Sequence, residues 1–343
     1  MPAVLFVPSR KFDYLQDVTY AGLATLLPAR DLGVSPRRLG YSVPLRRYPK
    51  NMGYVRTWPA LRGGPGPAEA EVIVLAACKP DAVEAYLRLS PRLRADAVRV
   101  FIDGGDRAEV GGDLDRLGRR DLLVALAADG GFDVVLKREL LRDPAVAGGY
   151  DPAALRPSGW PDIRVDRVRS FPLAVRSDLM PAPLPERDKA FDVAFWATVS
   201  HPDRARAFEQ LDGRYDCNAN GSIPRDKPKD FGHRGSAYLA QLARVRVGVN
   251  VRGNGWDTLR FWEMLGCGSA VVSQRTPLVL PAAPTHGREL LWVRQDLGDL
   301  HERIGELLGD ERRRAALAAA GRAWAFGHHD HRARGRQLLA AVG

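Results

Sequence analysis

The sequence is poor in cysteine and contains no long apolar run. Its three cysteines, Cys78, Cys217 and Cys267, are odd in number and far apart, which indicates neither a disulfide framework nor a zinc site. No apolar run approaches the roughly twenty residues that a membrane-spanning helix needs. The opening residues MPAVLFVPSR lack the basic start and the apolar length of a signal peptide. We therefore expect a cytoplasmic protein without a transmembrane segment.

Lysine and aromatic residues are also scarce. Only seven of the 51 basic residues are lysines, so arginine carries the net charge of +10. Arginine suits phosphate and carboxylate recognition, and the charge permits a nucleic acid or an anionic surface as partner. The codon bias of a GC-rich genome would also produce this excess of arginine over lysine, so the charge alone does not establish a partner. Aromatic residues make up 8% of the chain and are not interleaved with basic runs, which disfavours a groove that stacks nucleic-acid bases.

The chain is too long for one typical domain and suits two. In the first half, apolar runs alternate with helical patterns, which favours a parallel sheet covered on both faces. A further strand is expected at 170–175. The four clearest predicted strands cover residues 4–9, 72–77, 98–103 and 132–137.

A proline-rich segment separates this pattern from a second one. We predict an α/β fold of two tandem doubly wound domains with a cleft between them. The limits are residues 1–176 for the first domain, 177–190 for the linker, 191–327 for the second domain and 328–343 for a terminal helix that crosses back to the first domain. Ligands of such sheets bind at the carboxyl ends of the strands.

The second domain concentrates polar residues after its predicted strand 245–251. Gly253 and Gly255 leave backbone N–H groups open to close approach, and Asp257 or Thr258 can cap the following helix. The N-terminus of a helix favours an anion. This turn is therefore a candidate phosphate site.

Arg260 and Glu263 lie three residues apart on one face of the same helix. Arg260 can reach a phosphate, and Glu263 can accept hydrogen bonds from vicinal hydroxyls. The same pair also fits an ordinary ion pair in a packed corner. Spacing alone leaves both interpretations open.

The run GWDTLRFWEMLGCGSAVVSQ resembles the nucleotide-sugar-binding segment of GT-B glycosyltransferases, in particular CgeB-like and exostosin-like bacterial enzymes of the group-1 type. The ending HHDHRARGRQLL is similar to the ending of that group. DYLQDVTYAGLATLL and FDVVLKREL are similar to segments of related first domains. The resemblance is specific at 245–273 and 328–339.

This resemblance implies that Glu263 binds the donor ribose, that the turn and Arg260 hold the diphosphate, and that the loop 218–222 lies near the base. The residues it places on the donor side are Arg252, Gly253, Asn254, Gly255, Asp257, Thr258, Arg260 and Glu263. Many retaining relatives carry a second Glu where this chain has Gly255, so a retaining mechanism does not carry over. The resemblance implies a nucleotide-diphosphate sugar as co-substrate, with no further cofactor and no metal.

The first domain offers candidates for a catalytic base. Asp17 and Asp103 are our candidates, although helix capping near Asp17 and turn chemistry around Asp103 are equally ordinary roles. Lys137 and Arg138 follow a predicted strand and can grip an anionic acceptor or a phosphate, although such clusters are usually solvated. The histidines near residue 330 lack the spacing of metal ligands.

We predict a glycosyltransferase that uses a nucleotide-diphosphate sugar, with the donor in the second domain and an unidentified acceptor in the first. The acceptor is a small molecule, a glycan or a nucleic acid. Two alternatives remain: a nucleic-acid-binding protein or nucleic-acid-directed transferase that uses the basic surface, and a catalytically silent relative that only binds nucleotide sugars.

Overall fold

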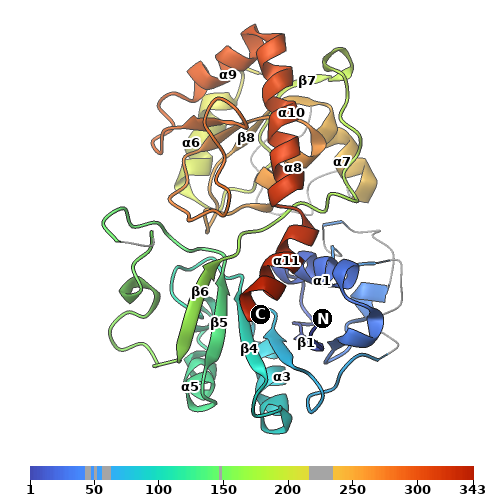
Figure 1. Ribbon diagram of the computed structural model, residues 1–343. Coiled ribbons are helices and arrows are strands. Elements are labelled where there is room, and N and C mark those ends of the chain that lie inside the picture. The colour runs from blue at the N-terminus through green and yellow to red at the C-terminus, as the bar shows by residue number, and fades with distance from the viewer. Residues whose placement is uncertain (43–47, 50–51, 56–62, 147–148, 216–234) are drawn as a thin grey trace.

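The computed structural model describes residues 1–42, 48–49, 52–55, 63–146, 149–215 and 235–343. They form two α/β domains, one above the other in Figure 1. The last helix runs from the upper domain into the lower one, where both chain ends lie. The first and last segments of the chain therefore share one domain.

The first domain is built on a parallel sheet. Its strands are β1 (Val4–Val7), β2 (Leu32–Val34), β3 (Val72–Leu75), β4 (Val98–Asp103), β5 (Phe132–Lys137) and β6 (Val165–Ser170). They are ordered β2-β1-β3-β4-β5-β6, and β1 and β3 are buried along their whole length. Its α-helices are α1 (Tyr14–Leu26), α3 (Pro80–Leu89), α4 (Gly112–Arg116) and α5 (Arg120–Ala128), with short 3-10 helices at Ala29–Asp31, Leu39–Ser42, Ser90–Arg92 and Ala153–Leu155.

The second domain follows a short 3-10 helix, Glu186–Asp188. Its described strands are β7 (Phe191–Ala194), β8 (Val245–Asn250), β9 (Ala270–Gln274) and β10 (Leu291–Val293), in the parallel order β10-β9-β8-β7. Its helices are α6 (Pro202–Leu211), α7 (Gly235–Ala243), α8 (Leu259–Cys267), α9 (Leu300–Gly309) and α10 (Glu311–His328), and the chain ends in α11 (His331–Val342). Among the described helices, none has the length and apolarity to cross a bilayer.

One apolar cluster is shared by the two domains. It runs from β1 and α1 to α8 and α10, whereas two further clusters each belong to one domain. Within it the indole of Trp262 stacks on that of Trp324, with ring centroids 5.7 Å apart. Because this packing is continuous across the boundary, the interface forms part of the core.

The predicted α/β class with two parallel sheets is confirmed. One strand was wrongly placed, because the sixth strand is β6 (Val165–Ser170) and not 170–175. Pro172 lacks the N–H that a ladder needs. The segment after β6 instead pairs with the start of α11, since the amide of Val175 donates to the carbonyl of His329 and the amide of His331 donates to the carbonyl of Val175.

Glycines allow α11 to cross α1 at very close range. A Cβ atom on Gly22 would lie 1.9 Å from the carbonyl oxygen of His331, and one on Gly335 would lie 2.8 Å from the backbone of Gly22. Only glycine fits at this crossing, which ties the end of the chain to the first domain.

A side chain at this crossing should therefore destabilise the fold. We expect Gly22→Ala to lower the free energy of unfolding by about 1–3 kcal/mol through overpacking. Gly305→Ala is the matched control, because a Cβ there meets nothing within 4 Å and alanine favours a helix by about 0.5–1 kcal/mol. Urea unfolding of both variants measures the difference, and equal effects would contradict the close crossing.

The segment between α10 and α11 buries a neutral histidine. His329 has no exposed surface, and its ring lies 4.8 Å from that of Trp262 and 4.6 Å from that of Trp324. Its Nδ1 accepts a hydrogen bond from Arg334 at 2.5 Å. Burial, and then the charge of Arg334, lowers the pKa of His329 to about 3.

This histidine makes the fold sensitive to acid. An unfolded histidine has a pKa of about 6.5, so the stabilisation is complete above that pH and is lost as the pH falls toward 3. The free energy of unfolding should fall by up to about 1.4 kcal/mol per pH unit over that range from this group. We expect a flatter pH dependence for His329→Asn in urea unfolding at a series of pH values. An unchanged slope would show that His329 is not the group responsible.

Candidate functional site

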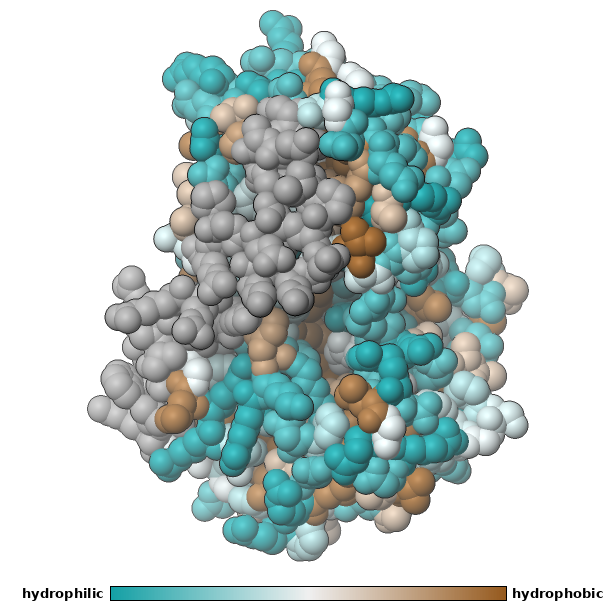
Figure 2. Space-filling view, turned by 180° about the vertical axis from the view of Figure 1, so that it is seen from behind, coloured by the Kyte–Doolittle hydropathy of each residue, from teal (hydrophilic) through white to brown (hydrophobic). Residues whose placement is uncertain are grey.

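A cavity of about 450 Å³ lies between the two domains. Figure 2 shows the surface hollowed where the domains meet. Its lining residues are Asp106, Arg107, Ala108, Glu109, Arg116, Glu139, Leu141, His201, Arg252, Asn254 and Trp256. They come from segments after β4, β5, β7 and β8, at the sheet edge where parallel α/β domains bind ligands. Of the predicted donor-side residues, Arg252 and Asn254 line this cavity.

The glycines of the turn after β8 let charged side chains approach its backbone closely. A Cβ atom on Gly255 would lie 2.4 Å from a carboxylate oxygen of Glu139 and 2.9 Å from the guanidinium of Arg138. A Cβ on Gly253 would lie 2.9 Å from the guanidinium of Arg204. The turn is therefore pressed between charged groups from both domains.

Glu139 joins the first domain to this turn. Its carboxylate accepts hydrogen bonds from the amide of Trp256 at 2.9 Å and from that of Asp257 at 3.0 Å. Burial raises the pKa of Glu139, against the opposing charge of Arg138. Two turn amides predicted to hold a diphosphate are thus occupied by a carboxylate. Glu139 directly follows Lys137 and Arg138, and the sequence did not single it out, because a charged cluster after a strand is usually solvated.

Asp257 and Thr258 have structural contacts. The Asp257 carboxylate accepts from the amide of Leu173 at 2.5 Å and from the indole of Trp262 at 2.8 Å, so it forms a second tie to the first domain. Thr258 is the N-cap of α8, as predicted, and its hydroxyl donates to Asn250 at 2.6 Å. Neither side chain is directed to a ligand by these contacts.

Glu263 is a buried carboxylate with one unpaired oxygen. Its Oε2 accepts from the hydroxyl of Tyr238 at 2.6 Å, whereas Oε1 has no partner with hydrogen-bond geometry among the described residues, although the nearby hydroxyl of Tyr48 helps to lower the pKa of Glu263. Burial raises the pKa of Glu263, and the nearby charge of Arg260 opposes this. Arg260 also acts on the pKa of Tyr14 in α1, which burial raises to about 12. The predicted pair therefore faces the first domain.

Arg204 is a site residue that sequence reasoning missed. It is 8% exposed and donates to the carbonyls of Val251 and Thr198 and to the hydroxyl of Ser200. No carboxylate of the described residues lies within ion-pair distance of it. Burial, and then the charge of Arg260, lowers its pKa to about 10. A cation in the first turn of α6 opposes the helix dipole, and that was the available signal.

Asp103 and Lys137 form a buried ion pair. Their charged atoms lie 2.9 Å apart, and neither side chain has any exposed surface. Asp103 also accepts from the amides of Gly105 and Gly111, and Lys137 donates to the carbonyl of Arg107. These contacts hold the loop after β4 and give neither residue access to the cavity, so the structure does not support a base at Asp103 or an anion grip by Lys137.

Asp17 is buried inside the first domain. It forms an ion pair with Arg38 and lies 3.3 Å from the hydroxyl of Tyr41. Burial raises its pKa to about 6 despite the charge of Arg38. With no exposed surface, Asp17 is placed to support α1 and not to meet an acceptor.

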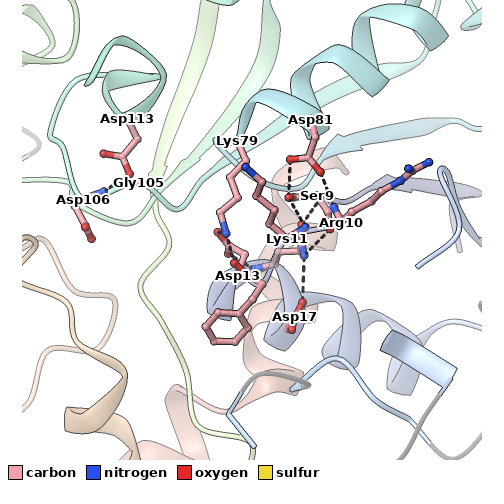
Figure 3. Close-up of polar contacts among 12 residues, drawn as sticks. Ser9, Arg10, Lys11, Asp13, Asp17, Lys79, Asp81, Gly105, Asp106 and Asp113 are labelled. Carbon is pink, nitrogen blue, oxygen red and sulfur yellow. Dashed lines mark hydrogen bonds and ion pairs between the residues drawn. The ribbon is translucent and has the colours of Figure 1, made fainter. Parts of the chain in front are cut away.

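Other carboxylates of the first domain lie closer to the surface. In Figure 3, Asp13 and Lys79 point toward each other at the start of α1, and their charged atoms lie 3.1 Å apart. Asp106 lies on the loop after β4 in the same view, and it forms an ion pair with Arg138. Asp106 retains 33% of its side-chain surface and lines the cavity. Neighbours of the predicted bases, rather than the bases themselves, are thus accessible.

Two further predictions concern a metal ion and the nucleotide base. Among the described residues, no group of histidine, cysteine or acidic side chains is arranged to hold a metal ion. The loop 218–222, predicted to lie near the nucleotide base, lies outside the described residues.

One family model matches the second domain and the terminal helix. Residues 188–340 match the family model Glyco_trans_1_2, described as glycosyl transferase-like. No curated protein matches the chain.

Solved structures match along the whole chain. HepE of Anabaena, solved with UDP and glucose, is 12% identical with a TM-score of 0.59, and the match covers 100% of this chain and 99% of that one. An alpha-glucosyltransferase solved with UDP and a 13-mer DNA is 12% identical with a TM-score of 0.56, covering 99% and 98%. Sucrose-phosphate synthase from Thermosynechococcus elongatus is 14% identical with a TM-score of 0.53, covering 99% and 100%.

These matches agree with the two parallel sheets and with the cavity between them. They support the predicted recognition at the level of the fold, and the family model matches the second domain, while the finer CgeB-like and exostosin-like assignment stays a prediction. The chain has the two-domain GT-B fold of these solved structures, and its residues 188–340 are similar to the glycosyl transferase-like family.

Proposed function

We propose that this protein is a glycosyltransferase that moves a sugar from a nucleoside-diphosphate sugar to an acceptor held on the first domain's side of the cavity. The observation that carries the proposal is the pair of guanidiniums beside the N-terminus of α8, buried Arg204 and half-buried Arg260. They lie at the edge between β7 and β8, where an open parallel sheet takes a nucleotide.

A diphosphate would neutralise this cationic site. Arg204 is buried with only carbonyl and hydroxyl partners among the described residues, and a buried cation is costly without an anion. Arg260 adds a second positive charge, since it lowers the pKa of Arg204. Fixed positive charge also stabilises the negative charge that develops on a departing nucleoside diphosphate.

Glu263 supplies the expected contact to a ribose. Its unpaired Oε1 can accept a hydroxyl proton, and a buried carboxylate oxygen without a donor is unfavourable until one arrives. It lies one turn beyond Arg260 on α8, so one helix serves both the diphosphate and the sugar of the nucleoside.

Deprotonation of the acceptor hydroxyl needs a general base, and a carboxylate on the first domain's side of the cavity can serve as one. Asp106 and Glu109 line the cavity together with Glu139. Our proposal therefore moves this role from Asp17 and Asp103 to Asp106 and Glu109. We further propose that the reaction uses neither a metal nor a separate cofactor and that it takes place in the cytoplasm.

The neighbours narrow the first ligands to test. HepE and the alpha-glucosyltransferase were both solved with UDP, which makes UDP the first nucleotide to try. The alpha-glucosyltransferase structure also contains DNA, and this chain carries a net charge of +10. A transferase acting on nucleic acid is therefore the second candidate, distinguished by transfer that requires DNA. A silent relative would bind the nucleotide without turnover.

The diphosphate site can be tested by thermal unfolding with UDP and with the other nucleoside diphosphates. A ligand present at a hundred times its dissociation constant stabilises by about 2.7 kcal/mol, which shifts the midpoint by several degrees. We expect Arg204→Gln to weaken nucleotide binding at least tenfold, because it removes a charge-assisted hydrogen bond.

Arg206→Gln is the matched control for this measurement. Arg206 lies on the same helix, half exposed and paired with Asp203, so its loss should leave binding unchanged. If no nucleoside diphosphate raises the midpoint of the folded protein, or if the two variants behave alike, the donor-site proposal fails.

The ribose contact has its own signature. Wild-type protein should bind UDP more tightly than its 2′,3′-dideoxy analogue, because Glu263 accepts from a ribose hydroxyl. In Glu263→Gln we expect this preference to fall by about tenfold, the worth of a hydrogen bond to a charged group. Calorimetric titration with both nucleotides measures it. A preference that survives the substitution would place the ribose elsewhere.

A further inference from the structure

The second domain has another, larger pocket that the proposed donor site does not use. Its volume is about 670 Å³, against about 450 Å³ for the cavity between the domains. It is formed at the carboxyl ends of β9 and β10 and by α9. The lining residues are Arg275, His286, Trp292, Val293, Arg294, Gln295, Asp296, Asp299 and Arg303. We call it the outer pocket.

The outer pocket continues the edge of the sheet on which the cavity lies. Gln274 connects the two, since its Oε1 accepts from the amide of Arg252 at 3.2 Å and its Nε2 donates to the carbonyl of Gln295 at 2.8 Å. Arg252 lines the cavity and Gln295 lines the outer pocket. Because adjacent strands lie about 4.8 Å apart, β8 and β10 end roughly 10 Å from each other.

Two tryptophans form the wall between these spaces. Trp256 lines the cavity, Trp292 lines the outer pocket, and both line a small void of about 20 Å³ between them. That void has room for about one water molecule, so a ligand cannot pass through the wall and has to run over it. Both indoles are half-buried, and the guanidinium of Arg252 lies over the ring of Trp256, 4.1 Å from its centroid. Trp292 therefore supplies the flat apolar surface with a polar edge that an indole offers. Such a surface suits the C–H face of a pyranose ring.

The polar groups of the outer pocket are mixed in sign. The carboxylate of Asp296 pairs with Arg294, and that of Asp299 pairs with Arg303. Arg275 is exposed and has no ion-pair partner among the described residues. Lining carboxylates repel a polyanion such as a nucleic-acid backbone, whereas mixed donors and acceptors match the hydroxyls of a sugar.

His286 adds a donor of defined orientation. Its Nδ1 accepts from the amide of Trp292 at 2.9 Å, so in the neutral imidazole Nε2 carries the hydrogen. The pocket therefore combines an aromatic platform, an imidazole donor and one unpaired guanidinium.

We propose that the outer pocket is a saccharide-binding subsite that holds a remote unit of an oligosaccharide acceptor whose reacting end lies in the cavity. This inference rests on the proposed glycosyltransferase function. Trp292 stacks on the sugar ring, His286 donates to a hydroxyl, and Arg275 binds a hydroxyl or the carboxylate of an acidic sugar. The acceptor class is thus a neutral or weakly acidic glycan chain long enough to span the wall.

The test is titration of the full chain, with UDP present, against hexasaccharides of glucose, N-acetylglucosamine and galacturonate and against the matching monosaccharides. We expect at least one hexasaccharide to bind more tightly than its monosaccharide. Trp292→Ala should weaken that hexasaccharide at least tenfold, and Arg275→Ala at least threefold. Trp160→Ala, a half-buried indole of the first domain, should leave binding unchanged.

Several results would overturn the inference. The first is that no hexasaccharide binds. The second is that Trp292→Ala and Arg275→Ala bind the hexasaccharide as tightly as the wild type does. The third is that a short DNA duplex binds and that the same two substitutions weaken its binding. The UDP-induced rise in unfolding midpoint is measured for each variant. If the rise persists in Trp292→Ala, the variant is folded. The same measurement separates the saccharide subsite from the proposed glycosyltransferase function. If only the subsite is wrong, UDP still raises the midpoint, whereas if the proposed function is wrong, UDP does not raise it even in the wild type.

Discussion

The carboxylate of Glu139 on the amides of Trp256 and Asp257 is the contact on which the arrangement of the site depends. It fixes the turn after β8 to the first domain. A second tie runs the other way, since the carboxylate of Asp257 accepts a hydrogen bond from the amide of Leu173. The turn sets the start of α8, so these bonds also decide that Arg260 and Glu263 face α1. Both carboxylates are buried, which raises their pKa values. Loss of either partner would leave buried amides unpaired, a cost of about 1–3 kcal/mol each.

The same interface concentrates positive charge. Burial makes Arg204 expensive for the fold, and the neighbouring Arg260 adds to that cost. A fold that retains such a cluster at the edge of a sheet has a site that an anion stabilises. The apolar cluster shared between the domains and the packing of α11 on α1 stabilise the fold against this clustered charge. Stability is thus located away from the cavity, where the proposed function uses the preorganised charge to stabilise a departing diphosphate.

Much of this could be predicted from the sequence. Apolar runs predicted four strands of the first sheet and β8 of the second, but they missed β2 and misplaced β6, whereas the glycines and Thr258 indicated the turn after β8 and the cap of α8. The role of Glu139 could not be predicted, because its partner Trp256 lies 117 positions away. Asp17 and Asp103 were the candidate bases, but in the structure they are buried and paired with Arg38 and Lys137. Local patterns identify a strand end, whereas tertiary packing decides which charge at that end stays exposed.

The central claim is that the α8 turn, Arg204 and Glu263 together form a donor site. A crystal structure of the protein with UDP tests it most directly. The account predicts phosphate oxygens within hydrogen-bonding distance of Arg204 and Arg260, and a ribose hydroxyl on the free oxygen of Glu263. UDP bound away from α8, with Glu263 still unpaired, would contradict it.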